Sequence, residues 1–229
     1  MRNKKFTKLF SLILSLVIIS TYIFVPANAA EPEYLSFYMD GFLIKTDYSA
    51  ADYYAVEQDV AEGYKTEVYN NEGELVQIFE LSEEEPQMGI ARGTGTINRT
   101  FSSQEVVSLR GVGLYGVKHT VILNIYVYDS FKQIESVAGD MVTAADGIGV
   151  YTVSNTISSV NAPNGYPSMS VDCTATAACE GSIDVSSDTA KEAGITVGGI
   201  INAGVGYTQS AGTIVYFRKT ITHNWSISL

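Results

Sequence analysis

The sequence from residue 151 to residue 179 reads YTVSNTISSVNAPNGYPSMSVDCTATAAC. Its middle part, residues 161–167, is dense in Asn, Pro and Gly, which are the residues that form turns. On both sides of this turn, apolar residues alternate with Ser and Thr over about ten positions. The stretch therefore predicts a long β-hairpin with one apolar face and one hydroxyl-rich face.

The alternation also predicts which side chains form the apolar face of this hairpin. Residues i and i+2 of a strand point to the same side of the sheet, so the expected apolar face contains only odd-numbered residues. They are Tyr151, Val153, Ile157, Met169, Val171, Cys173, Ala175, Ala177 and Cys179.

A second hairpin is expected near the end of the chain. Its arms are residues 195–207 and 213–229, with the turn at 209–212. Lys219 and His223 interrupt the apolar face of the return arm, which a β-bulge or a sheet edge would explain. Residues 187–194, between the hairpins, are compatible with one helical turn.

Residues 117–128 are the best candidate for a central strand. Val121, Leu123 and Ile125 alternate with Ile122 and other apolar or aromatic residues, so both faces are apolar. Such a strand belongs in the middle of a sheet that is covered on both sides. Together, these patterns predict an all-β fold, mostly antiparallel, with long Ser/Thr-rich strands in a sandwich-like or elongated arrangement.

One short helix is expected near the N-terminus, over residues 49–63. Ser49 is a suitable N-cap, Tyr53, Val56 and Val60 recur at helical spacing, and Gly63 is a stop signal. After it, residues 64–69 and 75–81 flank a plausible hairpin turn at 70–73.

The first 29 residues predict a cleaved export signal. A basic start is followed by an apolar run from Leu9 to Val25 and by Ala27-Asn28-Ala29, a small-x-small cleavage pattern. A retained membrane anchor is the alternative, but Ser and Thr residues interrupt the run and Pro26 follows it. We therefore expect a secreted, extracellular bacterial protein.

Charge divides the remaining chain. Residues 31–86 contain 15 Asp or Glu residues against Lys45 and Lys65, whereas residues 87–229 are nearly balanced. We place a domain boundary at 86, between an acidic segment (30–86) and a β-rich domain (87–229). Nucleic acid is an unsuitable partner because the chain lacks a basic stripe. A cationic peptide would suit the acidic segment, although solubility alone also explains its charge.

The two cysteines are expected to be unpaired. If Cys173 and Cys179 lie on one strand, they share a face but stand about 20 Å apart, which is too far for a disulfide. A bridge between them remains an alternative, since exported proteins favour disulfides, and it would require the intervening segment to loop.

The sequence carries no catalytic, metal-binding or cofactor motif. No Gly-x-Ser-x-Gly, His-Glu-x-x-His or phosphate-binding glycine loop is present. A nucleophilic pair such as Cys179 with His223 has no local signature, and structural roles explain His119 and His223 more simply. We therefore expect no enzyme activity, cofactor or metal.

The residue 151–179 hairpin has two interpretations. In a sandwich, its apolar face packs into the core and its hydroxyl face meets water. Alternatively, the uncharged, alternating arms suit insertion into a membrane. In composition this hairpin resembles the insertion hairpins of aerolysin-like pore-forming proteins, which are secreted and use long Ser/Thr-rich strands. That resemblance implies a membrane-facing set of Tyr151, Val153, Ile157, Met169, Val171, Ala175 and Ala177, and it implies oligomers.

A glycan- or cell-wall-binding role is the other non-enzymatic possibility. The sequence contains 15 tyrosines, whose rings stack on sugars, but a single tryptophan, Trp225. Tyrosine is also an ordinary strand residue. The sequence thus favours a binding or interaction role with an unknown ligand over membrane insertion, and membrane insertion over a Cys–His hydrolase.

Overall fold

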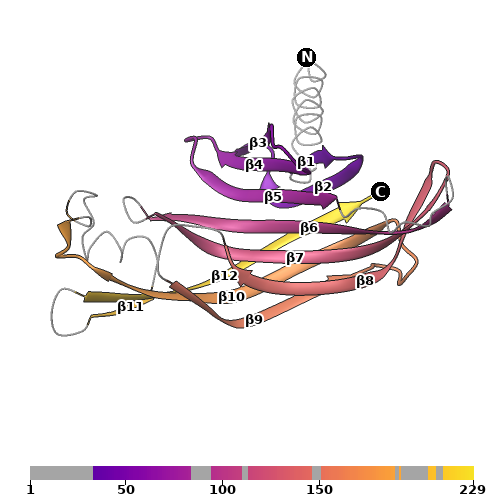
Figure 1. The fold of residues 1–229 in the computed structure, drawn as a ribbon. Coiled ribbons are helices and arrows are strands. Elements are labelled where there is room, and N and C mark those ends of the chain that lie inside the picture. Colours follow the sequence, from indigo (N-terminus) through magenta and orange to yellow (C-terminus); the bar gives the residue numbers. More distant parts are fainter. Residues whose placement is uncertain are drawn as a thin grey trace, which may run out of the picture. The chain divides into compact units, whose positions relative to one another are not determined.

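The computed structural model describes residues 33–83, 94–109, 113–145, 151–188, 191, 206–209 and 214–229. Tyr34–Leu229 forms one compact unit, and the expected export signal lies outside the described residues. The described part of this unit consists of antiparallel strands arranged in two sheets (Figure 1). The prediction of a mostly antiparallel, sandwich-like all-β fold is confirmed.

The first sheet contains the hairpin of residues 151–179. Its strand order is β1-β2-β12-β10-β9, and a short strand, β11, also pairs with β12. Its strands are β1 (Tyr34–Met39), β2 (Phe42–Ser49), β9 (Tyr151–Asn161), β10 (Ser170–Asp184), β11 (Gly206–Gln209) and β12 (Ile214–Ser228).

The second sheet follows chain order, β3-β4-β5-β6-β7-β8. Its two longest strands, β6 and β7, have 16 residues each and therefore extend about 50 Å. Its strands are β3 (Tyr53–Gln58), β4 (Tyr64–Asn70), β5 (Leu75–Glu83), β6 (Thr94–Leu109), β7 (Gly113–Tyr128) and β8 (Phe131–Ala144).

The first predicted hairpin is present as β9 and β10, which pair from Tyr151 opposite Gly181 to Asn161 opposite Asp172. In its turn, Gly165 has a φ of +79° and donates its backbone N–H to the Ala162 carbonyl at 3.0 Å. This left-handed conformation suits glycine, which explains the Asn-Gly signal in the sequence.

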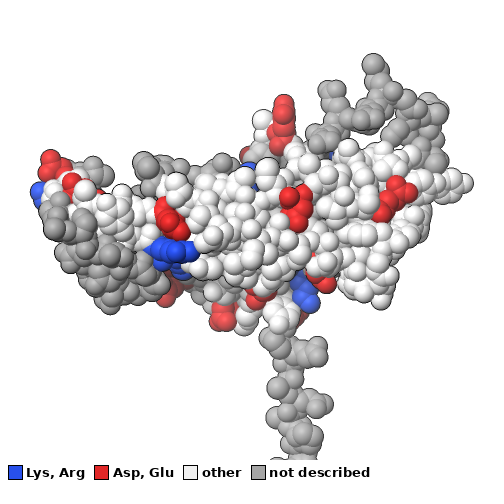
Figure 2. Space-filling view, turned by 90° about the horizontal axis from the view of Figure 1, so that it is seen from below, with Lys and Arg blue, Asp and Glu red and all other residues white. Residues whose placement is uncertain are grey.

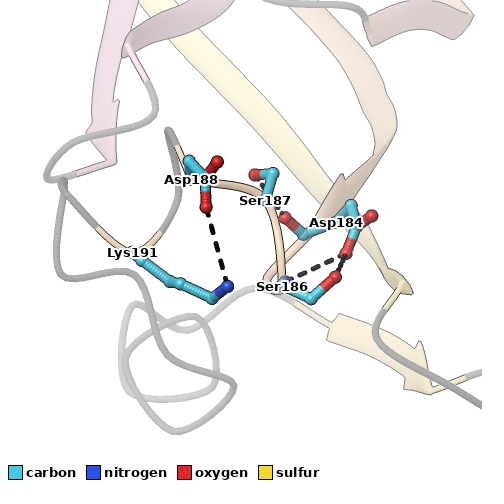
Figure 3. Close-up of polar contacts among 5 residues, drawn as sticks. All are labelled: Asp184, Ser186, Ser187, Asp188 and Lys191. Atoms are coloured by element: carbon cyan, nitrogen blue, oxygen red, sulfur yellow. Dashed lines mark hydrogen bonds and ion pairs between the residues drawn. The ribbon is translucent and has the colours of Figure 1, made fainter.

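A turn held by Asp184 ends β10 (Figure 3). The Asp184 carboxylate accepts hydrogen bonds from the backbone N–H and the hydroxyl of Ser186, at 2.9 and 2.7 Å. The Lys191 N–H donates to the Ser187 carbonyl at 3.0 Å, the i to i+4 bond of a helical turn. Of the second predicted hairpin, β11 pairs with β12 as expected, while residues 195–205 lie outside the described residues.

The predicted helix over residues 49–63 is wrong. The chain there forms a turn, with the Asp52 N–H donating to the Ser49 carbonyl, and then β3. β3 pairs with β4 over its whole length, and Tyr54 stacks on Tyr69 with ring centroids 5.7 Å apart. Tyr and Val favour strands once a partner strand lies beside them, so cross-strand pairing overrides a spacing that also fits a helix.

The hairpin predicted from residues 64–81 is confirmed as β4 and β5. The strands on the two sides of the expected boundary at 86 also pair, with Leu81 of β5 opposite Phe101 of β6. The acidic segment and the β-rich remainder therefore share one sheet.

The candidate central strand, residues 117–128, is part of β7 and pairs with β6 on one edge and β8 on the other. The prediction that both faces of this strand are covered is wrong. Val121, Leu123 and Ile125 are fully buried, but Ile122 is half-buried on the opposite face and Tyr128 is 57% exposed. One face packs in the core, and the aromatic residues of the other face meet solvent.

Two apolar clusters form the core between the sheets. The first core cluster is rich in aromatic residues and includes Phe42, Phe79, Phe101, Val121, Leu123, Ile125, Cys173, Trp225 and Ile227. The second core cluster contains smaller residues on average and consists of Tyr115, Val117, Ala177, Cys179, Val215, Phe217 and Ile221, with partly buried neighbours.

Candidate functional site

The outer face of the first sheet carries a polar grid. Thr174 and Thr176 of β10 lie opposite Asn224 and Thr222 of β12. The Thr174 hydroxyl donates to the Asn224 side-chain carbonyl at 3.0 Å, and the Thr176 and Thr222 hydroxyls are 2.8 Å apart. Seen from the side on which β9 and β10 lie in Figure 1, the surface carries scattered charged residues (Figure 2).

A shallow groove lies in this face, where β2, β12 and β10 run side by side. Its volume is about 270 Å³. It is lined by the exposed ring of a tyrosine, one lysine, two carboxylates and several hydroxyl or amide groups, together with the buried side chains of Cys173 and Trp225. These residues are Tyr34, Lys45, Thr46, Asp47, Asp172, Cys173, Thr174, Asn224, Trp225 and Ser226.

Sheet register positions the polar groups of the groove. Ser226 lies opposite Lys45 on one side and Asp172 on the other, so these three side chains form one row across three strands. In the next row, the Asn224 side-chain amide donates to the Asp47 carboxylate at 3.4 Å. Rows of a sheet are spaced by two residues, about 7 Å, so the groove offers donors and acceptors at regular intervals.

Tyr34 supplies the aromatic surface of the groove. Its side chain is on the edge strand β1, the residue is 42% exposed, and the Lys45 ammonium lies 4.8 Å from its ring centroid. A ring beside hydrogen-bonding groups is the arrangement by which proteins hold the apolar face and the hydroxyls of a sugar together.

The structure separates the residues that the sequence places on one apolar face of β9. Tyr151 and Val153 point inward and are partly buried, but Ile157 is 70% exposed on the outer face. A register shift in the β9–β10 ladder, with Asn155 at a φ of +52°, adds one residue to β9. The bulge reverses the alternation, so placing Ile157 with Tyr151 and Val153 is wrong.

On the other arm, the expected face is correct from Val171 onward. Val171, Ala175 and Ala177 are fully buried between the sheets, while Met169, which precedes β10, is 51% exposed. β10 pairs with β12 along its whole length, from Ser170 to Asp184. The hairpin thus combines an edge strand, β9, with an interior strand, β10.

The cysteines lie as predicted on one strand. Cys173 and Cys179 are both buried and free on β10. The Cys179 thiol donates to the Gly116 carbonyl at 3.5 Å, and burial raises its pKa to about 11. Cys179 lies opposite Lys219 and His223 lies opposite Ala175, four positions along β12, so this Cys–His pair is about 13 Å apart.

A polar belt separates the two core clusters. His119 lies between Val117 and Val121 on β7, and His223 lies between Ile221 and Trp225 on β12; in each case one neighbour belongs to each cluster. The belt consists of the polar side chains that meet at this level. Those of the interior are Tyr48, Gln77, Ser103, Glu105, His119 and His223, and Asp140 contacts His119 from the solvent-exposed edge strand β8.

Hydrogen bonds fix the protonation of His119. The Trp225 indole N–H donates to His119 Nδ1 at 3.2 Å, and His119 Nε2 is 2.8 Å from the Asp140 carboxylate. Because the indole can only donate, Nδ1 carries no proton, and Nε2–H donates to Asp140. Burial lowers the pKa of His119 despite the carboxylate beside it.

His223 is buried without a hydrogen bond at either ring nitrogen among the described residues. Burial, together with His119 nearby, lowers its pKa to about 3. The β10–β12 ladder continues past His223 without a register shift, so the predicted bulge is wrong. On its other side β12 pairs with β11 up to Arg218 and with β2 from Trp225 onward, so among the described residues the part between them is a local sheet edge, as the alternative predicts. The imidazole itself is an inward side chain that meets His119, 6.0 Å away between ring centroids.

Glu105 is the buried carboxyl group of the belt. The Tyr48 hydroxyl donates to its Oε1 at 2.7 Å, whereas its Oε2 is buried without a partner. Burial raises the pKa of Glu105 to about 7, although the Tyr48 hydrogen bond opposes this. Sequence reasoning did not single out Glu105, Asp140 or Tyr48, because only register shows that they face inward at one level.

Comparison of the chain with protein-family models, curated proteins and solved structures finds no match. Within the described ranges, three or more His, Cys, Asp or Glu side chains nowhere gather in a way that suits a metal ion. The described residues also include no helix with the length and apolarity needed to cross a membrane.

Proposed function

We propose that this protein is a secreted, non-enzymatic binding protein whose ligand is a polysaccharide. The groove on the outer face of the first sheet carries this proposal. It combines an exposed Tyr34 ring with a row of carboxylate, amide and hydroxyl groups. Sugars present hydroxyls at the ring edge and C–H groups on the ring face, which these two kinds of side chain complement.

Two further features support a binding face. β10 keeps its apolar side chains in the core, so its Ser/Thr face remains available to an external ligand. The neighbouring hydroxyls of Thr174, Thr176 and Thr222 extend the polar surface beyond the groove. A chain molecule longer than one sugar unit could therefore lie along the sheet. The first 29 residues predict export. An exported protein would meet extracellular or cell-wall glycans.

Affinity electrophoresis through gels that contain single soluble polysaccharides tests the proposal. We expect retardation by at least one glycan, and its loss in Tyr34→Ala and Asp172→Ala variants. Thr220→Ala is the matched control, because Thr220 is exposed on β12 and does not line the groove. Unchanged retardation in both groove variants would place binding elsewhere, and no retardation by any glycan would contradict the proposal.

A membrane-active role is the second candidate, and one observation favours it. The edge strand β9 has no fully buried side chain, and Ile157 lies exposed on it. Its hairpin partner β10, by contrast, is bonded to β12 throughout. Liposome dye release by the purified secreted protein tests this role, with oligomers expected on the vesicles. Absence of leakage over a range of lipids and pH would leave the hairpin as a permanent part of the sandwich.

A further inference from the structure

The interior of a sandwich is normally apolar, but here both sheets contribute polar groups at one level. Gln77 Oε1, Glu105 Oε2 and both ring nitrogens of His223 are buried without a hydrogen-bond partner among the described residues. Buried polar groups without partners destabilise the closed state. The contact between the sheets is therefore weakest at the polar belt, midway between the two core clusters.

We propose that the polar belt is an acid-sensitive contact between the two sheets: when its histidines take up protons, the sheets part there and the second core cluster becomes exposed.

The hydrogen bonds of His119 supply the first reason. A proton on Nδ1 would face the Trp225 indole N–H, which has no acceptor capacity, so the bond of 3.2 Å would be replaced by two opposed donors. Trp225 belongs to the first sheet and His119 to the second. Protonation of one side chain thus removes a hydrogen bond between the sheets.

The position of His223 supplies the second reason. Its imidazole is 1% exposed, and its nearest ring neighbour is His119 at 6.0 Å. Charging His223 would bury an unpaired cation, and charging both rings would place two cations side by side. Opening the sheets at this level lets both rings reach water.

Other titratable groups lie in the polar belt or next to it. Glu105 on β6 and Lys219 on β12 attract each other, while Asp47 on β2 opposes ionisation of Glu105. Asp140 on β8 is bonded to His119. Cys173 and Cys179 on β10 are buried thiols whose pKa values are raised by burial, so they stay neutral in acid. Lys118 on β7 forms an ion pair with Glu80 of β5.

Protonation of His223 and protonation of Glu105 have opposite effects on the stability of the closed state over part of the pH range. His223, with its pKa lowered to about 3, favours the closed state less and less as pH falls below about 6.5. Glu105, with its pKa raised to about 7, favours the closed state more as pH falls from about 7 to 4.5. The two effects offset each other between about pH 4.5 and 6.5. Below about pH 4.5, Glu105 no longer opposes protonation of His223, which on its own raises the ratio of open to closed molecules about tenfold per pH unit. Protonation of His119, whose pKa is also lowered by burial, adds to this effect.

Trp225 reports on opening directly, because it is the single tryptophan of the chain and is 3% exposed. We would measure iodide quenching of its fluorescence from pH 8 to pH 3 in the purified secreted protein, with far-ultraviolet circular dichroism alongside. The expected result is a sharp gain in quenching below about pH 4.5, while the β-sheet spectrum persists.

Two variants should move this transition in opposite directions. His223→Phe removes the titrating ring and should lower the transition by about one pH unit or more. Glu105→Gln keeps an acceptor for Tyr48 but removes the opposing titration, so opening should begin nearer pH 6.5. The proposal would be overturned if both variants opened at the same pH as the unaltered protein. It would also be overturned if the β-sheet circular dichroism spectrum were lost at the pH at which iodide begins to quench Trp225.

If neither variant folds, an NMR titration of the unaltered protein still tests the proposal. The protein has two histidines, so the C2–H signals of both can be followed by NMR during acid titration. Both should stay neutral until Trp225 becomes accessible and then titrate together with it. Titration of His223 near pH 6.5 with Trp225 still shielded would contradict the acid-sensitive contact.

Discussion

The two core clusters differ in the size of the side chains that form them. In the first, large aromatic rings interlock: Phe42 packs edge-on against Phe101 with centroids 5.1 Å apart, and Phe79 packs against Trp225 at 5.7 Å. The second has fewer large rings, contains smaller residues such as Ala177 and Cys179, and includes partly buried Tyr151 and Val153 of the edge strand β9. A cluster with fewer large side chains buries less apolar area, so we expect the first cluster to dominate stability.

Paired truncations test this ranking most directly. Phe101→Ala removes a ring that is 1% exposed from the first core cluster, and we expect it to cost about 3–5 kcal/mol of unfolding free energy. Phe217→Ala, in the second cluster, should cost less than about 3 kcal/mol because its margin can collapse into the space. Urea denaturation of both variants gives the comparison, and equal losses would show that the clusters contribute alike.

The second cluster also depends on a close backbone approach. A Cβ on Gly116 would collide with the Glu105 carbonyl of the paired strand. The Gly116 carbonyl meanwhile accepts hydrogen bonds from Cys179 and from the Tyr151 hydroxyl. Gly116→Ala should therefore separate β6 from β7 locally and cost about 1–3 kcal/mol. Gly139→Ala is the matched control, because Gly139 also lies in a strand without a left-handed φ and its Cβ would meet only the end of the Ile122 side chain, at 3.1 Å. A Gly116 variant no less stable than that control would contradict the close approach.

Glu105, between the clusters, should give stability a pH dependence at neutral and alkaline pH. Its pKa is raised in the folded state, so the folded protein binds more protons than the unfolded chain between about pH 4.5 and 7. This contribution is present in mild acid and is lost as pH rises through about 7. We expect Glu105→Gln to be the more stable protein at pH 8.5, by up to about 3 kcal/mol. Urea midpoints of both proteins at pH 5.5 and 8.5 check the sign, and a wild-type advantage at pH 8.5 would refute it.

The smallest effect is expected at the outer face of β9. Ile157→Asp places a carboxylate where the native side chain is 70% exposed, so the unfolding free energy should change by no more than about 0.5 kcal/mol. Val171→Asp, on the buried face of β10, is the contrasting substitution and should prevent folding. A thermal melt distinguishes the two, and a severe loss with Ile157→Asp would mean that this face is covered.

Alternation of apolar and hydroxyl residues is sufficient to predict β9 and β10, because β10 buries one face and β9 turns partly buried side chains toward the core. It fails at Ile157, since the bulge at Asn155 depends on pairing with β10 and leaves no signal in the local sequence. Helical spacing is misleading at Tyr53 and Val56. Their spacing fits a helix, but their residue types fit a strand, and the chain forms β3 there.

The candidate sites needed register that the sequence does not contain. Tyr34, Asp47 and Asp172 lie far apart in the chain and line one groove because β2, β12 and β10 are neighbours. The sequence predicts only a structural role for His119, because its neighbour His223 comes from a distant strand across the core. Pairing between distant strands is decided by the whole fold, so local patterns predict strands better than sites.

The pairing of β2 with β12 has a kinetic consequence. Thr46 lies opposite Trp225, so the two ends of the folded unit meet in one sheet. Such a ladder has high contact order and forms slowly, because a long loop must close before any of its hydrogen bonds are made. During synthesis, β1 and β2 are made first, and β2 can pair with β12 only after residues 214–228 have been made. The first sheet therefore cannot be completed until nearly the whole polypeptide has been synthesised.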